Sequence, residues 1–228
     1  NTSRIRPSQR GMELRMRRYD AFDDNMTNEE YIAWTCKLFD MFDKILKSNG
    51  KILYNMSYGN ENNECMWMTI SEIIQHTNFT IADSIIWKKK SALPNNVSHN
   101  KLTRIIEYVF VFCRKNEYKT FHANKEVSKV GKNGQTFYKV LYNFIEAANN
   151  DGATKINKAT YSSELCLKLL EMYAPKHGLV YDPFMGTGTT AIACEILNLN
   201  CIGTEIDNEQ VEYSNNRLKE YRNGISCK

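Results

Sequence analysis

Hydrophobic and polar positions follow two periods along the chain, and the pattern is clearest toward the carboxy terminus. Continuous apolar runs predict strands over residues 178–184 and 201–206. Apolar residues at helical spacing predict helices over residues 189–200 and 208–221. Strand, helix, strand and helix thus follow one another, an order that is typical of an α/β fold with a largely parallel sheet.

The first half of the chain carries a second group of elements. Apolar residues at helical spacing predict a helix over residues 27–51, which the pair Asn49-Gly50 is expected to end. Thr27 and Glu30 have the spacing of a capping box at its start. Its expected buried face consists of Tyr31, Trp34, Leu38, Phe42 and Ile45. The further predicted elements are strands over residues 51–58, 79–89 and 105–115 and a helix over residues 65–78.

Between residues 116 and 157 the hydrophobic pattern weakens, and Lys, Asn, Gly and Thr dominate. Residues 91–104 have the composition of a loop. A helix is predicted over residues 163–174, with Pro175 just past its end. No internal repeat or low-complexity tract is found, so the pattern indicates an ordinary globular chain.

The composition agrees with this interpretation. Of the 228 residues, 42% are hydrophobic and 25% are charged, which allows a sizeable core. No apolar run approaches the length of a membrane span, and the opening residues lack the layout of a signal peptide. The 7 cysteines are scattered without CxxC spacing, so we expect reduced thiols in a cytoplasmic protein rather than disulfides or a metal site.

Basic residues gather in the first part of the chain, although the net charge is only +4. Residues 1–18 hold six arginines against one acid, Glu13. Two interpretations remain open: a solvated arm, or contact with a polyanion such as DNA. The arginines are Arg4, Arg6, Arg10, Arg15, Arg17 and Arg18.

The segment 182–190, DPFMGTGTT, places a glycine turn between a predicted strand and a predicted helix. Three ligands could use such a turn. A Walker-type nucleotide site is excluded, because Gly188 is followed by Thr189-Thr190 instead of Lys and Ser or Thr. A dinucleotide site survives weakly, since Ala191 would take the place of the third glycine. S-adenosylmethionine remains, because its carboxylate suits the amides of a turn and a helix amino terminus.

Glu205 stands at the carboxyl end of the next predicted strand. A carboxylate there can accept both hydroxyls of a ribose, which NAD and S-adenosylmethionine share, and the alternative is a solvated strand-end acid. The place of the turn separates the two cofactors. A dinucleotide fold normally opens on its glycine turn, whereas here only one further strand and helix follow it. The other half of the sheet must therefore come earlier in the sequence, in a permuted order.

Residues 161–218, from YSSELCLKLL through DPFMGTGTT and GTEID to NNRL, resemble the cofactor-binding part of the permuted, beta-class DNA amino-methyltransferases. This family methylates adenine N6 or cytosine N4. The pattern D-P-F-x-G-[ST]-G-T-T, G-x-E and R-L is quite specific, and the resemblance covers nearly the whole chain. It implies a single Rossmann-like, S-adenosylmethionine-dependent α/β domain with a mostly parallel sheet over residues 1–228. Its expected parts are a catalytic-side half (1–115), a small target-recognition insertion (116–157) and a cofactor-binding half (158–228).

The resemblance also implies cofactor-binding residues. Those expected to hold the methionine and adenosine parts are Asp182, Phe184, Gly186, Thr187, Gly188 and Thr189. Glu205 would bind the ribose hydroxyls, and Ile206 would lie against the adenine. Ser162 and Ser163 stand where the family has a further cofactor-contacting motif, although KATYSSEL replaces the usual H-P-x-x-K.

The family's catalytic motif, [D/N/S]-P-P-[Y/F], is not found in this sequence. In the family its polar side chain and a backbone carbonyl accept the hydrogens of the target amine, while its aromatic ring stacks on the flipped base. The prolines here are Pro7, Pro94, Pro175 and Pro183, and none are adjacent. Because the motif is often followed by a pair such as Asn1-Thr2, we expect it to precede residue 1, so that no catalytic residue lies within the chain.

Binding of DNA would require positive charge and a region that reads bases. The expected DNA-binding residues are Arg4, Arg6, Arg10, Lys88, Lys89, Lys90, Lys101 and Arg104. For the lysines the alternative is an ordinary solvated loop. The stretch 116–157 occupies the family's target-recognition position, and its lysines Lys119, Lys125, Lys129 and Lys132 fit that role. It is short for this purpose, which leaves room for a homodimer.

These observations predict a site-specific DNA methyltransferase of the restriction–modification kind, with adenine N6 favoured over cytosine N4 on its frequency in the class. A catalytically silent nucleic-acid-binding subunit with the same fold is the alternative, and the absent proline pair favours it. A dehydrogenase fits less well, because no substrate-binding half follows the turn.

Overall fold

The computed structural model describes residues 26–57, 63–91, 99, 102–152 and 160–224. Their contacts form two compact units. The amino-terminal unit comprises residues 26–149 and 164–176, and the carboxy-terminal unit comprises the described residues from 150 to 163 and from 177 onward. Among the described residues, no helix has the length and apolar character needed to cross a membrane.

The amino-terminal unit is built on a four-stranded sheet with the order β1-β3-β2-β6. Its strands are β1 (Ile52–Met56), β3 (Ile106–Arg114), β2 (Phe79–Lys89) and β6 (Phe144–Ala147). Strand β3 pairs antiparallel with both β1 and β2, and β6 pairs parallel with β2, with Ile86 opposite Phe144. Five consecutive residues of β3, 109–113, are buried, so both faces of this strand are covered, which explains its continuous apolar run.

This sheet is mixed, whereas the sequence led us to expect a mostly parallel one. A parallel connection needs a long crossover, usually a helix, and the segment between β2 and β3 carries no helical pattern. The helix α3 (Glu64–His76) does supply such a crossover between β1 and β2, which consequently run in the same direction on either side of β3. The α/β class was predicted correctly, whereas a mostly parallel sheet is not confirmed in this unit, because β3 runs antiparallel to both of its neighbours.

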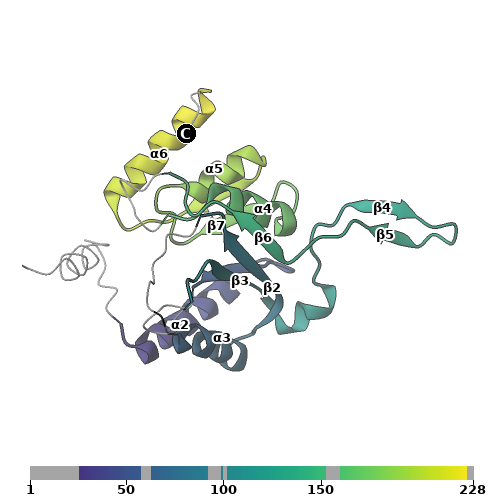
Figure 1. The fold of residues 1–228 in the computed structure, drawn as a ribbon, viewed down its shortest axis with the longest axis horizontal. Coiled ribbons are helices and arrows are strands. Elements are labelled where there is room, and N and C mark those ends of the chain that lie inside the picture. Colours follow the sequence, from purple (N-terminus) through teal and green to yellow (C-terminus); the bar gives the residue numbers. More distant parts are fainter. Residues whose placement is uncertain (1–25, 58–62, 92–98, 100–101, 153–159, 225–228) are drawn as a thin grey trace, which may run out of the picture. The chain divides into compact units, whose positions relative to one another are not determined.

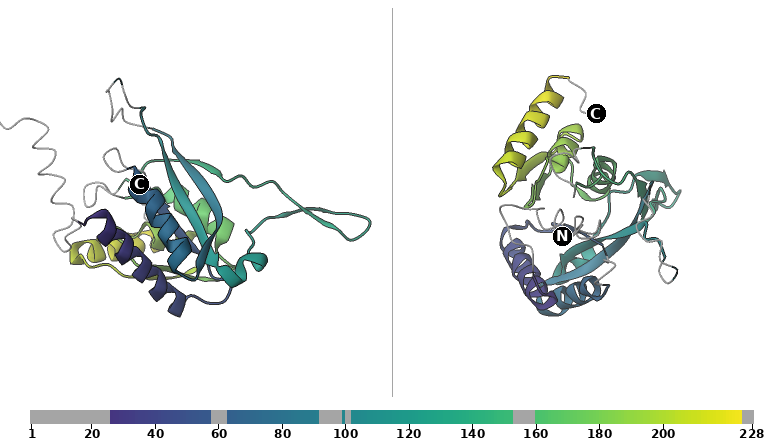
Figure 2. Two further views of the ribbon diagram at one scale, coloured as in Figure 1. Left: turned by 90° about the horizontal axis from the view of Figure 1, so that it is seen from below. Right: turned by 60° about the vertical axis from the view of Figure 1, so that its left-hand side comes forward.

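Helices α2 (Asn28–Ile45) and α3 lie together on one face of the sheet (Figures 1 and 2). Phe39 of α2 is fully buried and makes edge-to-face ring contacts with Phe79 and Phe112 at centroid distances of 5.6 and 5.0 Å. The core residues around it are Met66, Ile70, Ile73 and Phe110. Helix and sheet therefore share one hydrophobic core.

The capping box predicted for α2 is present, with hydrogen bonds from the Glu30 N–H to Thr27 Oγ1 and from the Thr27 N–H to Glu30 Oε2. The predicted buried face is rotated by one position. The buried residues of α2 are Ile32, Thr35 and Phe39, and the predicted Ile45 is 62% exposed. Counting only apolar residues misplaced the stripe, because Thr35 is buried and satisfies its hydroxyl on the Tyr31 carbonyl at 2.8 Å.

Four elements lie in the region where the hydrophobic pattern weakened. They are the 3₁₀ helix η1 (Lys115–Thr120), β4 (Val127–Val130), β5 (Thr136–Tyr138) and β6. Strands β4 and β5 form a hairpin that extends away from the sheet (Figure 1). Every residue of β4 and β5 is exposed, so no alternation of buried and exposed residues marked them. The pair Asn133-Gly134, with Gly134 at φ 82°, is the hairpin signal that could have predicted them.

The carboxy-terminal unit follows the predicted alternation. Its elements are β7 (Leu179–Asp182), α5 (Thr189–Ile196), β8 (Asn200–Gly203) and α6 (Asn208–Arg222). The two strands are parallel, with Leu179 opposite Asn200. The side chain of Asp207 caps α6 by accepting the N–H groups of Glu209 and Gln210. Helix α4 (Ser163–Tyr173) was also predicted, and from residue 164 it packs in the amino-terminal unit.

Candidate cofactor site

The glycine turn between β7 and α5 has the tight geometry that its sequence predicted. Gly186 and Gly188 have φ angles of 52° and 84°, in the left-handed region that favours glycine. The Gly188 N–H donates to the Met185 carbonyl at 3.0 Å and closes the turn. A Cβ atom at position 188 would collide with the side chain of Ser214 on α6. The turn therefore needs glycine both for its backbone and for the close approach of α6.

Asp182 ends β7 and holds the start of this turn. Its Oδ1 accepts the Phe184 N–H at 3.0 Å, and its Oδ2 accepts the hydroxyl of Thr190. Tyr161 also hydrogen-bonds the hydroxyl of Thr190. The carboxylate thus links the strand to both the turn and the first residues of α5. In this structure Asp182 supports the turn from within.

Glu205 lies opposite the turn, just beyond the end of β8. Its Oε2 accepts the Gly186 N–H at 2.8 Å, and its Oε1 accepts the N–H groups of Ile206 and Asp207 at 2.8 and 3.0 Å. Each carboxylate oxygen offers two lone pairs, so Oε2 has capacity for one more donor. Three backbone donors also fix the orientation of the carboxylate, which excludes a freely solvated strand-end acid.

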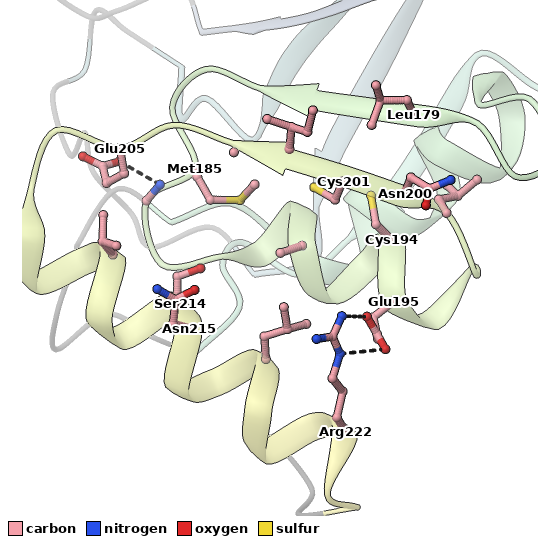
Figure 3. A pocket seen from close by; sticks show the side chains of 17 residues that line it. Leu179, Met185, Cys194, Glu195, Asn200, Cys201, Glu205, Ser214, Asn215 and Arg222 are labelled. Carbon is pink, nitrogen blue, oxygen red and sulfur yellow. Dashed lines mark hydrogen bonds and ion pairs between the residues drawn. The ribbon is translucent and has the colours of Figure 1, made fainter.

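A cavity of about 580 Å³ opens next to Glu205, between β8, α5 and α6 (Figure 3). This volume is within the range of small-molecule sites, about 300–1,000 Å³. Met185 and Leu218 contribute apolar wall, and Gly186 and Glu205 line one end. At the other end Arg222 donates to both carboxylate oxygens of Glu195, at 3.0 and 2.7 Å, and these hydrogen bonds lower the pKa of Glu195.

Two thiols face this cavity, those of Cys194 on α5 and Cys201 on β8 (Figure 3). A hydrogen bond with Cys194 lowers the pKa of Cys201. All six described cysteines are free, as we expected for reduced thiols, and Cys227 lies outside the described residues. Cys113, Cys166 and Cys194 are buried, whereas Cys36, Cys65 and Cys201 are only partly buried.

Two predicted residues present apolar surface beside these polar groups. Phe184 follows Asp182 in the turn and is 59% exposed, and Ile206 follows Glu205 and is 62% exposed. Exposed apolar side chains next to a carboxylate suit a flat ring that carries a ribose. The turn, Glu205, Phe184 and Ile206 together fit an adenosine-containing cofactor.

The hydroxyl-bearing residues of the prediction turn inward instead. Ser162, Thr187 and Thr189 are buried, and both threonine hydroxyls donate to Asp151. Ser163 begins α4. Asp151 and its partner Arg217 were not predicted. Arg217 belongs to the R-L pair of the family pattern and could have been found from it, whereas Asp151 lies in a polar stretch without a signal.

The lysines expected to bind DNA lie on or next to β2, and each pairs with a glutamate. The salt bridges are Lys88–Glu146 at 2.8 Å, Lys89–Glu107 at 2.5 Å and Lys90–Glu164 at 2.8 Å. Arg104 donates to Asn63 Oδ1 at 3.3 Å. Arg4, Arg6, Arg10 and Lys101 lie outside the described residues. Trp87, which directly precedes these lysines, is 2% exposed, which makes it a core residue and not a platform for a base.

Glu164, the partner of Lys90, also forms an ion pair with a second lysine, Lys168. Its carboxylate accepts hydrogen bonds from Lys90 and Lys168, which lower its pKa to about 2. The Ala148 N–H adds a weaker hydrogen bond at 3.3 Å. The three contacts connect the end of β2, the segment after β6 and the first turns of α4 within the amino-terminal unit.

Comparisons with known proteins agree with this geometry. A sequence model of a DNA methylase family, which unites N6 and N4 methyltransferases, matches residues 4–216. The type II methyltransferase M.BglII of Bacillus subtilis is 24% identical over 83% of this chain and 57% of its own length. M.HinfI of Haemophilus influenzae is 26% identical over 90% of this chain and 55% of its own length. Among these and M.BamHII of Bacillus amyloliquefaciens, the chain spans 55–64% of each relative.

Solved structures share the fold. The M1.HpyAVI–SAM complex is 25% identical, with a TM-score of 0.57, over 80% of each chain. The cytosine-N4-specific PvuII DNA methyltransferase is 18% identical, with a TM-score of 0.66, over 91% of this chain and 81% of its own. The glycine turn after β7 and the acid after β8 are thus accompanied by a match over most of the sequence, and the chain belongs to the N6/N4 DNA methylase family.

Proposed function

We propose that the protein is a site-specific DNA methyltransferase that uses S-adenosylmethionine to methylate the exocyclic amine of a flipped base. Membership of the DNA methylase family supports this, and so do the type II methyltransferases among its relatives. The observation that carries the proposal is the pairing of the turn with Glu205 through the Gly186 N–H. We further propose that residues 1–228 act as one methyltransferase domain, with residues 158–228 as its cofactor-binding half.

The residues of the carboxy-terminal unit would hold the cofactor. S-adenosylmethionine supplies an electrophilic methyl group on a sulfonium. The turn from Gly186 to Gly188 and the first turn of α5 would bind its carboxylate, because helix amino termini and turn amides attract anions. Glu205 would accept the ribose hydroxyls, with the first hydroxyl donating to the free lone pair of Oε2 beside the Gly186 N–H. Phe184 and Ile206 would hold the adenine.

The amino-terminal unit would contact DNA. Lys88 and Lys90 form partly exposed ion pairs, which are weak enough to be exchanged for phosphates, whereas the Lys89–Glu107 pair is more deeply buried. The β4–β5 hairpin lies in the region expected to recognise the target, and it carries Lys129 and Lys132. The family's proline motif is not found among residues 1–228, so we assign no catalytic residue here.

Transfer of a tritiated methyl group from S-adenosylmethionine to unmethylated DNA by the full-length protein tests the proposal. Incorporation is expected, and nucleoside analysis should find N6-methyladenine rather than N4-methylcytosine. DNA binding without incorporation would favour a catalytically silent subunit. Light scattering of the same sample tests the expected homodimer.

Substitution of Glu205 tests the cofactor site separately. An amide at this position offers one oxygen and one NH₂ group to three backbone donors, so Glu205→Gln should place two donors face to face. We expect its Kd for S-adenosylmethionine, measured by calorimetry, to rise by roughly tenfold. Glu171→Gln, an exposed change on α4, is the matched control and should leave the Kd unchanged. NAD binding with no S-adenosylmethionine binding would contradict the assignment.

A further inference from the structure

A buried carboxylate lies directly behind the glycine turn. The side chain of Asp151 has 0% exposure. Its Oδ2 atom accepts hydrogen bonds from Thr189 Oγ1 at 2.5 Å and Thr187 Oγ1 at 3.4 Å. The same oxygen forms a salt bridge with Arg217 Nη1 at 2.5 Å. Donors from the turn, from α5 and from α6 therefore converge on one atom.

Arg217 binds the turn a second time. Its Nη1 also donates to the backbone carbonyl of Thr187 at 3.2 Å, and its side chain is 11% exposed. Thr187 stands between Gly186 and Gly188, both of which have left-handed backbone angles. Glycine backbones are conformationally permissive, so the residue between them needs outside contacts to hold one conformation. Arg217 and Asp151 supply such contacts through the carbonyl and the hydroxyl of Thr187.

The burial of this pair makes its geometry strict. A buried charge is costly unless it is paired and hydrogen-bonded, and removal of one partner leaves the other charge uncompensated. The Asp151–Arg217 pair therefore persists only while the threonine hydroxyls and the turn keep their places. In the reverse direction, the pair disfavours other conformations of the turn.

We propose that Asp151 and Arg217 are positioning residues that set the glycine turn in the shape that binds the methyl donor. This inference rests on the proposed function, since it concerns the affinity for S-adenosylmethionine. Neither side chain needs to touch the donor. They act through Thr187 and Thr189, whose backbone forms the turn and the start of α5.

A double-mutant cycle on the full-length protein tests the pair. Asp151→Asn and Arg217→Gln should each raise the calorimetric Kd for S-adenosylmethionine by roughly 10- to 100-fold. Because the two residues act as a unit, the double variant should raise the Kd by much less than the product of the single effects. Arg217→Lys keeps the charge and should fall between the wild type and Arg217→Gln, which preserves a test if Asp151→Asn fails to fold.

A matched ion pair separates positioning from general stability. Asp43 and Arg114 in the amino-terminal unit are 2.5 Å apart and partly buried. Asp43→Asn should lower the melting temperature but leave the Kd unchanged when binding is measured well below that temperature. If the variants of the Asp151–Arg217 pair also lower only the melting temperature, the inference is wrong. Failure of the wild type to bind S-adenosylmethionine would instead overturn the proposed function, and this inference with it.

Discussion

Gly188 combines two constraints at a single position. Its φ of 84° is costly for any residue with a Cβ atom, and that atom would strike Ser214. Gly203 has only the second constraint, because its added Cβ would meet the Cε, Cγ and Cβ atoms of Met185, a side chain with several rotatable bonds. The two glycines therefore allow backbone strain to be compared with crowding alone.

We expect Gly188→Ala to lower the free energy of unfolding by more than Gly203→Ala. The left-handed backbone alone costs about 1–2 kcal/mol for alanine, before the collision with Ser214 is added. Urea unfolding of both variants beside the wild type measures the difference. Equal losses would show that α6 and the turn relax around the new methyl group.

Several residues of the site could be predicted, but their hydrogen bonds could not. The motif located Gly186, Gly188 and Glu205 correctly at the turn and at the end of β8. It did not show that the hydroxyls of Thr187 and Thr189 point toward Asp151, because that direction depends on a residue far away in the sequence. The spacing of a motif predicts candidate ligand-binding residues, and it does not predict the hydrogen bonds that hold those residues in place.

At the scale of elements, prediction succeeded where the hydrophobic face was buried. Strand β2 was predicted at its observed bounds, and α2 carries its predicted capping box. The β4–β5 hairpin was missed, because its residues are exposed and the only local signal was Asn133-Gly134. The antiparallel pairings of β3 were also missed, since strand direction depends on connections that periodicity does not describe.

Glu164 connects the end of β2, the segment after β6 and the first turns of α4. Its contribution to the free energy of unfolding should depend on pH. Its folded pKa of about 2 lies below the ordinary value of 4.5, so the stabilisation is complete above about pH 4.5 and is lost as the pH falls through 2. At neutral pH, Glu164→Gln should cost about 1 kcal/mol or less, since solvent screens the partly exposed carboxylate. Denaturant unfolding between pH 7 and pH 3 measures the difference in free energy of unfolding between the wild type and Glu164→Gln.

The difference in free energy of unfolding between the wild type and Glu164→Gln should become smaller toward pH 3. Glu171→Gln, on the exposed side of the same helix, is the control and should show no such convergence. A gap that stays constant with pH would mean that the hydrogen-bonding shape of the side chain matters and its charge does not.

The whole molecule consists of two units, and the candidate roles divide between them. The residues that fit the cofactor lie in the carboxy-terminal unit, whereas Lys88, Lys89 and Lys90 and the hairpin belong to the amino-terminal unit. The expected boundaries at residues 115 and 157 differ from this grouping, because residues 116–149 and 164–176 make their contacts within the amino-terminal unit. Long-range contacts of this kind leave no mark in local composition.

This division predicts that DNA affinity and cofactor affinity can be changed separately. Replacing both Lys129 and Lys132 by alanine should weaken DNA binding and reduce the salt dependence of log K by about 1–2. The Kd for S-adenosylmethionine should not change. The control is the double alanine variant of the exposed Lys37 and Lys44 on α2, which should keep the wild-type salt dependence. Equal slopes for both double variants would exclude the hairpin from the DNA interface.

The exposure of every side chain in β4 and β5 has an evolutionary consequence. No residue of β4 or β5 contributes to a core, so substitutions there should change the free energy of unfolding little. The sequence of the hairpin could therefore change many times during evolution while the sequence of the rest of the protein changed little. If the hairpin reads bases, new sequence specificities could arise on an old scaffold without any intermediate that fails to fold.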